Sequence, residues 1–133
     1  MEKLVLDSTV WIDIERNNSA LDDVLSDNYQ LILPAVVSAE LRYKFANYLM
    51  GPEKQQEARN FLALVESVCD FAPFDTDVVE KYVDLRTYCK REGAPRSVHD
   101  LMIAATAVTY GALLKSSDNK AKFEELPNLR VLP

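Results

Sequence analysis

The 133-residue chain is poor in the residues that mark secreted, zinc-binding or membrane proteins. It has two cysteines and one histidine, and no stretch approaches the roughly 18 apolar residues of a membrane helix. Cys69 and Cys89 lie in no metal-binding spacing, so we expect reduced core thiols and no disulfide. The N-terminal segment turns polar at Asp7, too early for a signal peptide. We therefore expect a cytoplasmic protein without a membrane segment.

The chain also lacks an excess of positive charge. Its 15 Lys and Arg residues against 21 Asp and Glu residues give a net charge of −6, which argues against a protein that coats nucleic acid through its overall field. A nuclease is not excluded, because clustered acids bind divalent cations that reverse the local field. The basic residues form two local groups, for which solvated surface is the simpler interpretation: Arg86, Lys90, Arg91 and Arg96, then Lys115, Lys120 and Lys122.

Apolar patterns predict strands that alternate with helices in one domain, residues 1–133. Strands are expected at residues 3–6, 30–37, 69–74 and 112–115, and a fifth at 129–132. Predicted helix boundaries include Ser38, Asp75 and Ser97 as N-caps, and Gly51-Pro52, Gly93 and Gly111 as stops. This alternation favours a three-layer α/β/α sandwich with a mainly parallel sheet of four to five strands.

Asp100 stands at the start of a predicted helix that is otherwise almost wholly apolar, residues 98–107. Desolvating an unpaired carboxylate costs several kcal/mol or more, so this position suggests a site. Ser97, three residues earlier, offers a second interpretation as a capping box with Asp100. Ala104 and Ala107 share a face with Asp100, so the sheet can approach closely there. Capping and metal binding can coexist.

Three other acids occupy comparable places, and each has a simpler structural explanation. Asp7 follows the first strand, where ligand crevices form, but it also suits a helix N-cap. Glu40 is expected in the first turn of a helix, where it could instead pair with Lys44 on the surface. Asp118 follows the fourth strand, within a segment, 116–119, that is typical of an Asx-turn.

Convergence of these acids would require a cation. Two like charges 4 Å apart repel by about 4 kcal/mol at an effective dielectric near 20. All-oxygen ligation suits Mg²⁺ or Mn²⁺, and the chain lacks the histidines and cysteines that zinc prefers. Such ions activate water and neutralise charge on a phosphodiester. Phosphodiester hydrolysis is therefore the predicted chemistry.

Four motifs resemble those of PIN-domain ribonucleases, in the right order and at compatible spacings. They are residues 4–9, 36–41, 99–107 and 113–123, and they extend over nearly the whole chain. The third motif is the most specific, and the first is next. The closest resemblance is to the VapC-type toxins of prokaryotic toxin–antitoxin pairs.

The resemblance implies an endoribonuclease that depends on Mg²⁺ or Mn²⁺. It also implies a homodimer and a cognate VapB-type antitoxin whose tail occupies the acidic groove. The residues that match the family's metal-binding catalytic quartet are Asp7, Glu40, Asp100 and Asp118. Thr9 matches a hydroxyl that supports the first acid, and Ser117 or Ser116 matches one near the fourth, where threonine is more usual.

Three further residues are candidates for contact with RNA. Arg96 precedes the helix of Asp100 and could meet a phosphate at its N-terminus, although a solvated loop arginine is the simpler interpretation. His99 points about 100° away from Asp100, which predicts a polar rim or an RNA contact. Lys115 ends the fourth strand. The aromatic residues Tyr43, Phe45 and Tyr48 suit either the core or a dimer or antitoxin surface.

Other functions remain open from the sequence. Lys115 would suit a phosphorylation receiver domain, but that fold wants adjacent acids after strand one, and Ser8 follows Asp7. A dehalogenase-type phosphatase needs a second aspartate where Thr9 stands. A PIN-like module that only grips a partner, and a PIN nuclease of RNA processing outside a toxin–antitoxin pair, fit the same motifs.

Overall fold

A parallel β-sheet forms the centre of the computed structural model, which describes residues 1–17, 28–48 and 50–133. Its strands are β1 (Glu2–Leu6), β2 (Tyr29–Pro34), β3 (Asp70–Ala72), β4 (Leu113–Lys115) and β5 (Arg130–Val131). They pair in the order β3-β2-β1-β4-β5, and every pairing is parallel. The predicted sheet is confirmed, with shorter third and fifth strands than the patterns indicated.

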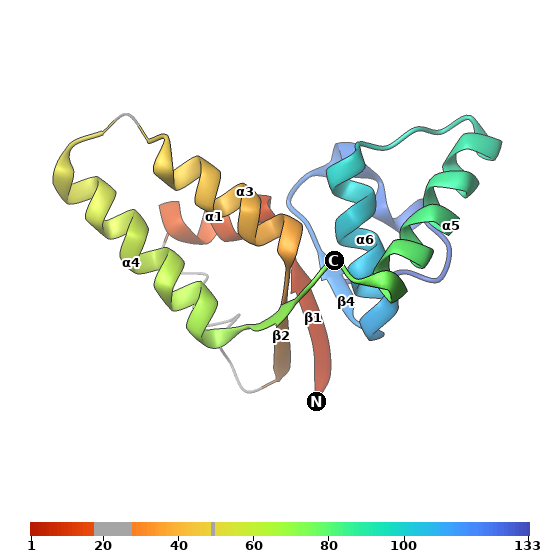
Figure 1. Cartoon of the computed structure of the whole chain (residues 1–133), viewed down its shortest axis with the longest axis horizontal. Helices are drawn as coiled ribbons and strands as arrows, with labels where there is room; N and C mark the ends of the chain where they lie inside the picture. Colours follow the sequence, from red (N-terminus) through yellow and green to blue (C-terminus); the bar gives the residue numbers. More distant parts are fainter. Residues whose placement is uncertain (18–27, 49) are drawn as a thin grey trace.

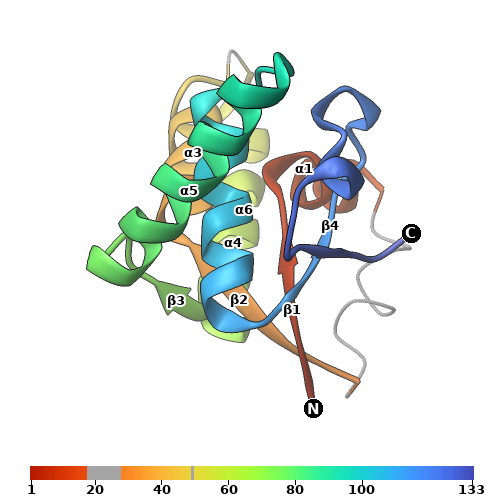
Figure 2. The ribbon, with the colours of Figure 1, turned by 90° about the vertical axis from the view of Figure 1, so that its right-hand side faces the viewer.

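Helices cover both faces of this sheet. They are α1 (Ser8–Arg16), α3 (Ala35–Ala46), α4 (Pro52–Val68), α5 (Thr76–Glu92) and α6 (Val98–Tyr110), with the short 3₁₀ turns η2 (Asn119–Ala121) and η3 (Phe123–Glu125). In Figure 1, α3 and α4 form one arm, and α5 and α6 form the other. Figure 2 shows α6 between α5 and the strands, with α1 on the opposite side of β1. The three-layer α/β/α prediction is confirmed.

The core occupies both faces of the sheet, and part of it lies where α6 meets β1. Leu4, Val5 and Leu6 of β1 are fully buried, as expected for a central parallel strand covered on both faces. Ala104 and Ala107 of α6 are also buried, so the small side chains let this helix approach β1 closely. No helix in the described ranges is long and apolar enough to cross a membrane.

Local capping chemistry sets several helix ends where the sequence predicted them. The Asp75 carboxylate accepts a hydrogen bond from the Val78 amide at 3.2 Å, and the Ser97 hydroxyl accepts one from the Asp100 amide at 3.1 Å. Gly93 and Gly111 end α5 and α6 in the left-handed region, each with φ of 63°. Residues that flank α6 in the sequence therefore fix both ends of this helix, which carries Asp100.

Two predicted helix boundaries were wrong. Ser38 does not cap a helix, because β2 runs to Pro34 and α3 starts directly after it. Glu40 consequently lies in the second turn of α3 rather than the first. Pro52 does not end a helix but begins α4, a position where its missing N–H costs no hydrogen bond.

Both cysteines are free thiols, as predicted. Cys89 is buried and Cys69 is half-buried. Burial, with a smaller contribution from the charge of Asp70, raises the pKa of Cys69 to about 12. The thiol therefore stays protonated and unreactive at neutral pH.

Candidate active site

Asp7 occupies the junction between β1 and α1 and is only 3% exposed. Its carboxylate caps α1 by accepting the Val10 amide at 3.2 Å, and it also accepts the Thr9 hydroxyl. Burial raises the pKa of Asp7; hydrogen bonds from Ser116, Thr9 and Val10 oppose this, and the charge of Asp100 adds to it. The N-cap interpretation is therefore confirmed, and the charge of Asp100 acts on the same carboxylate.

Glu40 and Asp100 approach Asp7 from α3 and α6. Burial is the main cause that raises the pKa of Glu40, and the charges of Asp100 and Asp7 raise it further. The Glu40 Oε1 atom is buried and has no hydrogen-bond partner among the residues that the structure describes. The charge of Asp100 thus raises the pKa values of Asp7 and Glu40, and that of Asp7 raises the pKa of Glu40, so these three carboxylates form an acid cluster in which one oxygen faces no donor among the described residues.

His99 is the partner of Glu40, in place of the predicted surface pair with Lys44. The His99 Nδ1 atom lies 3.5 Å from Glu40 Oε2, and the contact lowers the pKa of Glu40. The imidazole is 62% exposed. The single histidine therefore lies at the rim of the acid cluster, where it joins α6 to α3.

Asp118 takes part in a turn beside the cluster. Its Oδ1 accepts the Lys120 amide at 2.8 Å, so the Asx-turn that the sequence offered as an alternative is present. Its own amide donates to the Ser116 hydroxyl at 2.9 Å, and Ser116 also hydrogen-bonds to Asp7. Asp118 is not among the charges that shift the pKa of Asp7 or Glu40. The structure brings three of the four predicted acids together and ties the fourth to them through Ser116.

The hydroxyl groups that support Asp7 come from Thr9, as predicted, and from Ser116 rather than Ser117. Thr9 donates to Asp7, as predicted, and also accepts the Ser117 amide at 3.0 Å. Ser117 contributes only this backbone group, whereas Ser116 supplies the second hydroxyl to Asp7. The loop after β4 is thereby fastened to the end of β1. The pair Ser116-Ser117 left this choice open in the sequence.

Arg96 and Lys115, two candidates for RNA contact, have other partners. The Arg96 side chain is 8% exposed, and it donates to three backbone carbonyls and one carboxylate: Ala94 (2.6 Å), Ala121 (2.7 Å), Lys122 (3.3 Å) and Glu125 (2.8 Å). It therefore holds the segment after β4 against the loop before α6, which corrects its expected phosphate role. Lys115 Nζ donates to the Pro133 carbonyl at 2.9 Å.

The acid cluster fits a hard divalent cation by its chemistry. Among the described residues, no three histidine, cysteine or carboxylate side chains are already spaced to hold a metal ion. The donors are nevertheless carboxylates, the type that Mg²⁺ and Mn²⁺ prefer. Burial and mutual repulsion raise the pKa values of Asp7 and Glu40, and Glu40 Oε1 has no donor. A cation would offset both the repulsion and the unpaired oxygen.

The sheet topology excludes the receiver alternative. Receiver domains use the strand order 2-1-3-4-5, with β1 beside β3. In this chain β1 lies between β2 and β4. The dehalogenase alternative lacks its second acid, because Thr9 occupies that position and donates its hydroxyl to Asp7.

Comparisons with known proteins identify the family of the chain. Ribonuclease VapC of Rickettsia bellii is 28% identical over 130 residues, covering 97% of this chain and 94% of that protein. Among solved structures, VapBC2 from Rickettsia felis, bound to a promoter DNA fragment, superposes with a TM-score of 0.84 at 22% identity over 98% of this chain and 97% of that one. FitAcB from Neisseria gonorrhoeae gives 0.74 at 26% identity, over 98% and 96%. The PIN domain sequence profile matches residues 4–129, so the chain belongs to the PIN domain family.

Proposed function

We propose that residues 1–133 form a single endoribonuclease domain that requires Mg²⁺ or Mn²⁺ and cleaves RNA phosphodiester bonds. One observation carries the proposal: Asp7 after β1, Glu40 on α3 and Asp100 on α6 form one acid cluster, in which Asp100 raises the pKa values of Asp7 and Glu40, and Glu40 Oε1 is buried without a partner among the described residues. In open parallel sheets this edge is where ligands bind. Asp7, Glu40 and Asp100 would hold the cation, with Asp118 as the outermost acid.

The bound cation would activate a water molecule and neutralise charge on the phosphodiester. The residues of the chain would orient the reacting groups. Thr9 and Ser116 fix the Asp7 carboxylate by hydrogen bonds, and His99 contacts Glu40 Oε2. Glu40 Oε1 has no hydrogen-bond partner among the described residues, so this oxygen would contact the cation.

We further propose that this enzyme is the toxin of a toxin–antitoxin pair and works in the cytoplasm as a homodimer. The curated relative is named a ribonuclease VapC, and the solved neighbours are VapBC and FitAB assemblies that match nearly the full length of both chains. A VapB-type antitoxin would hold the free enzyme inactive. A nuclease of RNA processing without an antitoxin is the alternative outcome.

The enzymatic proposal is tested by incubating purified, partner-free protein with single-stranded RNA and Mg²⁺, Mn²⁺ or EDTA. We expect cleavage only with a metal ion, and a loss of about 100-fold or more for Asp7→Asn and Asp100→Asn, since loss of a supporting residue alone costs 10–100-fold. Asp84→Asn, an exposed acid on α5, is the matched control and should retain activity. Cleavage in EDTA, or full activity of both site variants, would contradict the proposal.

The toxin assignment is tested in bacteria. Induced expression of the chain should arrest growth, and the Asp100→Asn variant should not. Co-expression of a small DNA-binding protein encoded beside the gene should restore growth. Normal growth with active enzyme, or no rescue by the neighbouring gene, would favour RNA processing outside a toxin–antitoxin pair.

A further inference from the structure

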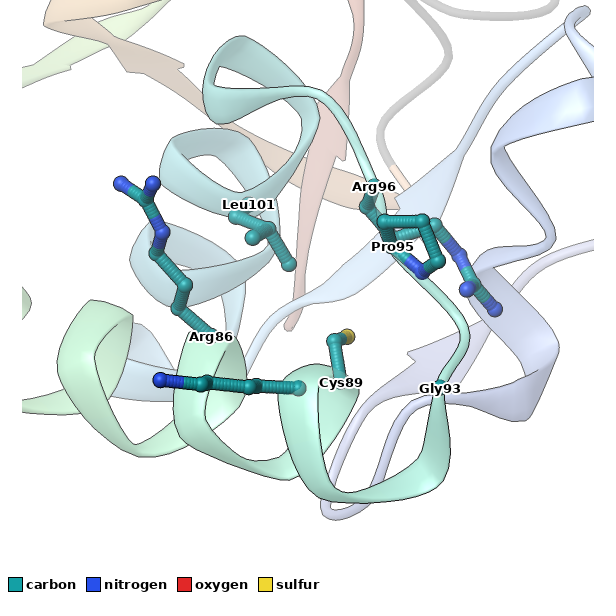
Figure 3. Close-up of a pocket in the computed structure, with 7 residues that line it drawn as sticks. Arg86, Cys89, Gly93, Pro95, Arg96 and Leu101 are labelled. Atoms are coloured by element: carbon teal, nitrogen blue, oxygen red, sulfur yellow. The ribbon is translucent and has the colours of Figure 1, made fainter.

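A hollow of about 400 Å³ lies between the C-terminal half of α5, the loop that follows it and the first turn of α6 (Figure 3). Its floor is apolar and comes from Cys89, Pro95 and Leu101, and its cationic residues are Arg86, Lys90 and Arg96. No carboxylate is among the described residues that line it, although acids outnumber bases by 21 to 15 in the chain. This combination of charge and apolar surface favours an anionic ligand with an apolar part.

Two of the three cations are available to such a ligand. The donors of Arg96 are occupied by carbonyls and Glu125, and Figure 3 shows its side chain pointing away from Arg86. The Arg86 guanidinium donates to the neutral Tyr82 hydroxyl at 2.7 Å and lies 6.0 Å from the centre of the Tyr82 ring. Lys90 is exposed, and neither Arg86 nor Lys90 forms an ion pair within the described ranges.

The hollow adjoins the acid cluster through α6. Leu101 follows Asp100 directly, and successive side chains on a helix diverge by about 100°, so the acid and the floor of the hollow occupy adjacent sides of the same turn. Pro95 and Arg96 lead into the N-cap Ser97. The positive end of the α6 dipole lies between the two places and favours phosphate there. A strand of phosphates can therefore pass from the acids over this turn into the hollow.

We infer that the hollow binds a nucleotide next to the cleaved phosphodiester of single-stranded RNA. Arg86 and Lys90 contact its phosphate, and its base covers the apolar floor. Single-stranded RNA is bound by cations that follow the backbone and by surfaces that accept the face of a base, and the hollow offers both. An acidic peptide would use the cations but has no equivalent of the base. The inference rests on the proposed function, because it names the RNA path through that same site.

The test measures binding of a fluorescein-labelled single-stranded RNA in EDTA, where cleavage is not expected, by anisotropy over a range of KCl concentrations. Arg86→Ala/Lys90→Ala should weaken binding about tenfold. It should also reduce the slope of log K against log salt by about 0.7, since the two residues contact one phosphate and each single-strand phosphate contact contributes about 0.7. Lys81→Ala/Arg91→Ala removes the same charge from exposed positions of α5 outside the hollow and should change neither quantity.

A charge-preserving pair, Arg86→Lys/Lys90→Arg, checks that the fold is intact and should bind RNA almost normally. In Mg²⁺ the alanine pair should raise KM and leave kcat unchanged, as expected for lost uniform binding. Equal losses in the two alanine pairs, or a polyglutamate peptide that competes as well as RNA at equal charge, would overturn the inference. If the alanine pair loses RNA binding but wild type never cleaves RNA, the proposed nuclease activity is overturned and the hollow is supported. If wild type cleaves RNA and the alanine pair has an unchanged KM, the nuclease is supported and the hollow is overturned.

Discussion

Asp7 stabilises the fold as a helix cap and destabilises it as a buried charge. As an N-cap it stabilises α1, a contribution of roughly 1 kcal/mol for such residues. As a charge it is buried beside Asp100, and both effects raise its pKa. The proton is therefore bound more strongly in the folded state than in the unfolded chain, where the pKa is about 3.9. This contribution to stability is fully present below that value and is lost as pH rises through the folded pKa.

The first prediction follows from this sign. In EDTA at pH 7, Asp7→Asn should raise the melting temperature, because asparagine keeps the cap without the buried charge. The difference should shrink as pH falls towards 4. Thermal unfolding followed by circular dichroism at both pH values measures it. A variant less stable than wild type at pH 7 would show that the carboxylate is stabilised by contacts other than a metal.

Addition of Mg²⁺ should reverse the order of stability. A ligand that binds only the folded state stabilises it by RT ln(1 + [L]/Kd), so wild type should gain melting temperature with Mg²⁺ concentration. The Asp7→Asn variant should gain little. Asp84→Asn, with an exposed acid on α5, serves as the control for general salt effects. An equal gain in all three proteins would contradict a metal site at Asp7.

Asp118 should matter less than Asp100. Its Oδ1 already serves the turn with Lys120, and an asparagine can make the same turn. Asp118→Asn should therefore reduce RNA cleavage by about tenfold, the lower end of the roughly 10–100-fold range for residues that support direct ligands, against about 100-fold or more for Asp100→Asn. Measuring kcat/KM for both variants over Mg²⁺ concentration ranks the two acids. Equal losses would place Asp118 among the direct ligands.

At the scale of elements, Arg96 connects two segments that both lead to the site. The loop before α6 carries the arginine, and its carbonyl partners Ala121 and Lys122 follow Asp118. Hydrogen bonds from a charged donor contribute about 1.5–3 kcal/mol each when buried partners would otherwise be left unpaired. Arg96→Ala should therefore reduce the free energy of unfolding by roughly 3 kcal/mol, as measured by urea denaturation.

Glu125 provides the control for this prediction. Its carboxylate is 54% exposed, so its ion pair with Arg96 is screened by solvent and contributes about 1 kcal/mol or less. Glu125→Gln should consequently change stability much less than Arg96→Ala. If both variants lost the same stability, the ion pair rather than the carbonyl contacts would hold these segments together.

Roles that depend on residues nearby in the chain could be predicted from the sequence, whereas contacts between distant residues could not. Asp75, Ser97 and Gly93 act on groups within a few residues, so their roles as caps could be predicted. The helix around Glu40 began earlier than expected because Pro34 ends a strand and starts a helix at once. Asp7, Glu40 and Asp100 could be grouped only through the resemblance and the rule about strand ends.

The partners of Arg96 and Glu40 could not be predicted in the same way. Arg96 bonds to a carbonyl 25 residues away, and His99 reaches Glu40 across two helices. No local pattern encodes such contacts, because they depend on how α6 and the segment after β4 pack. For the contact between His99 and Glu40, the only signal in the sequence was that the single histidine stands beside Asp100.

At the scale of the whole molecule, large apolar side chains remain exposed on several elements. Tyr43 on α3 is 74% exposed, Phe71 on the edge strand β3 is 59% exposed and Val83 on α5 is 52% exposed. Phe45 and Tyr48 pack into or against the core, so Tyr43 is what remains of the aromatic surface that the α3 sequence indicated. Burying apolar surface yields about 25 cal/mol per Å², so whichever of these side chains lies in the proposed homodimer interface would contribute to association.

We therefore expect sedimentation equilibrium to give twice the mass of one chain, with dissociation on dilution. The interface can be identified with three separate variants, Tyr43→Ser, Phe71→Ser and Val83→Ser. The substitution that lies within the dimer interface should shift the equilibrium towards single chains. The other two should sediment as wild type. Since the acids of the proposed site all come from one chain, the dissociated variant should still cleave RNA with Mg²⁺. A single-chain mass at every concentration would contradict the homodimer, and loss of cleavage on dissociation would mean that the partner chain completes the site.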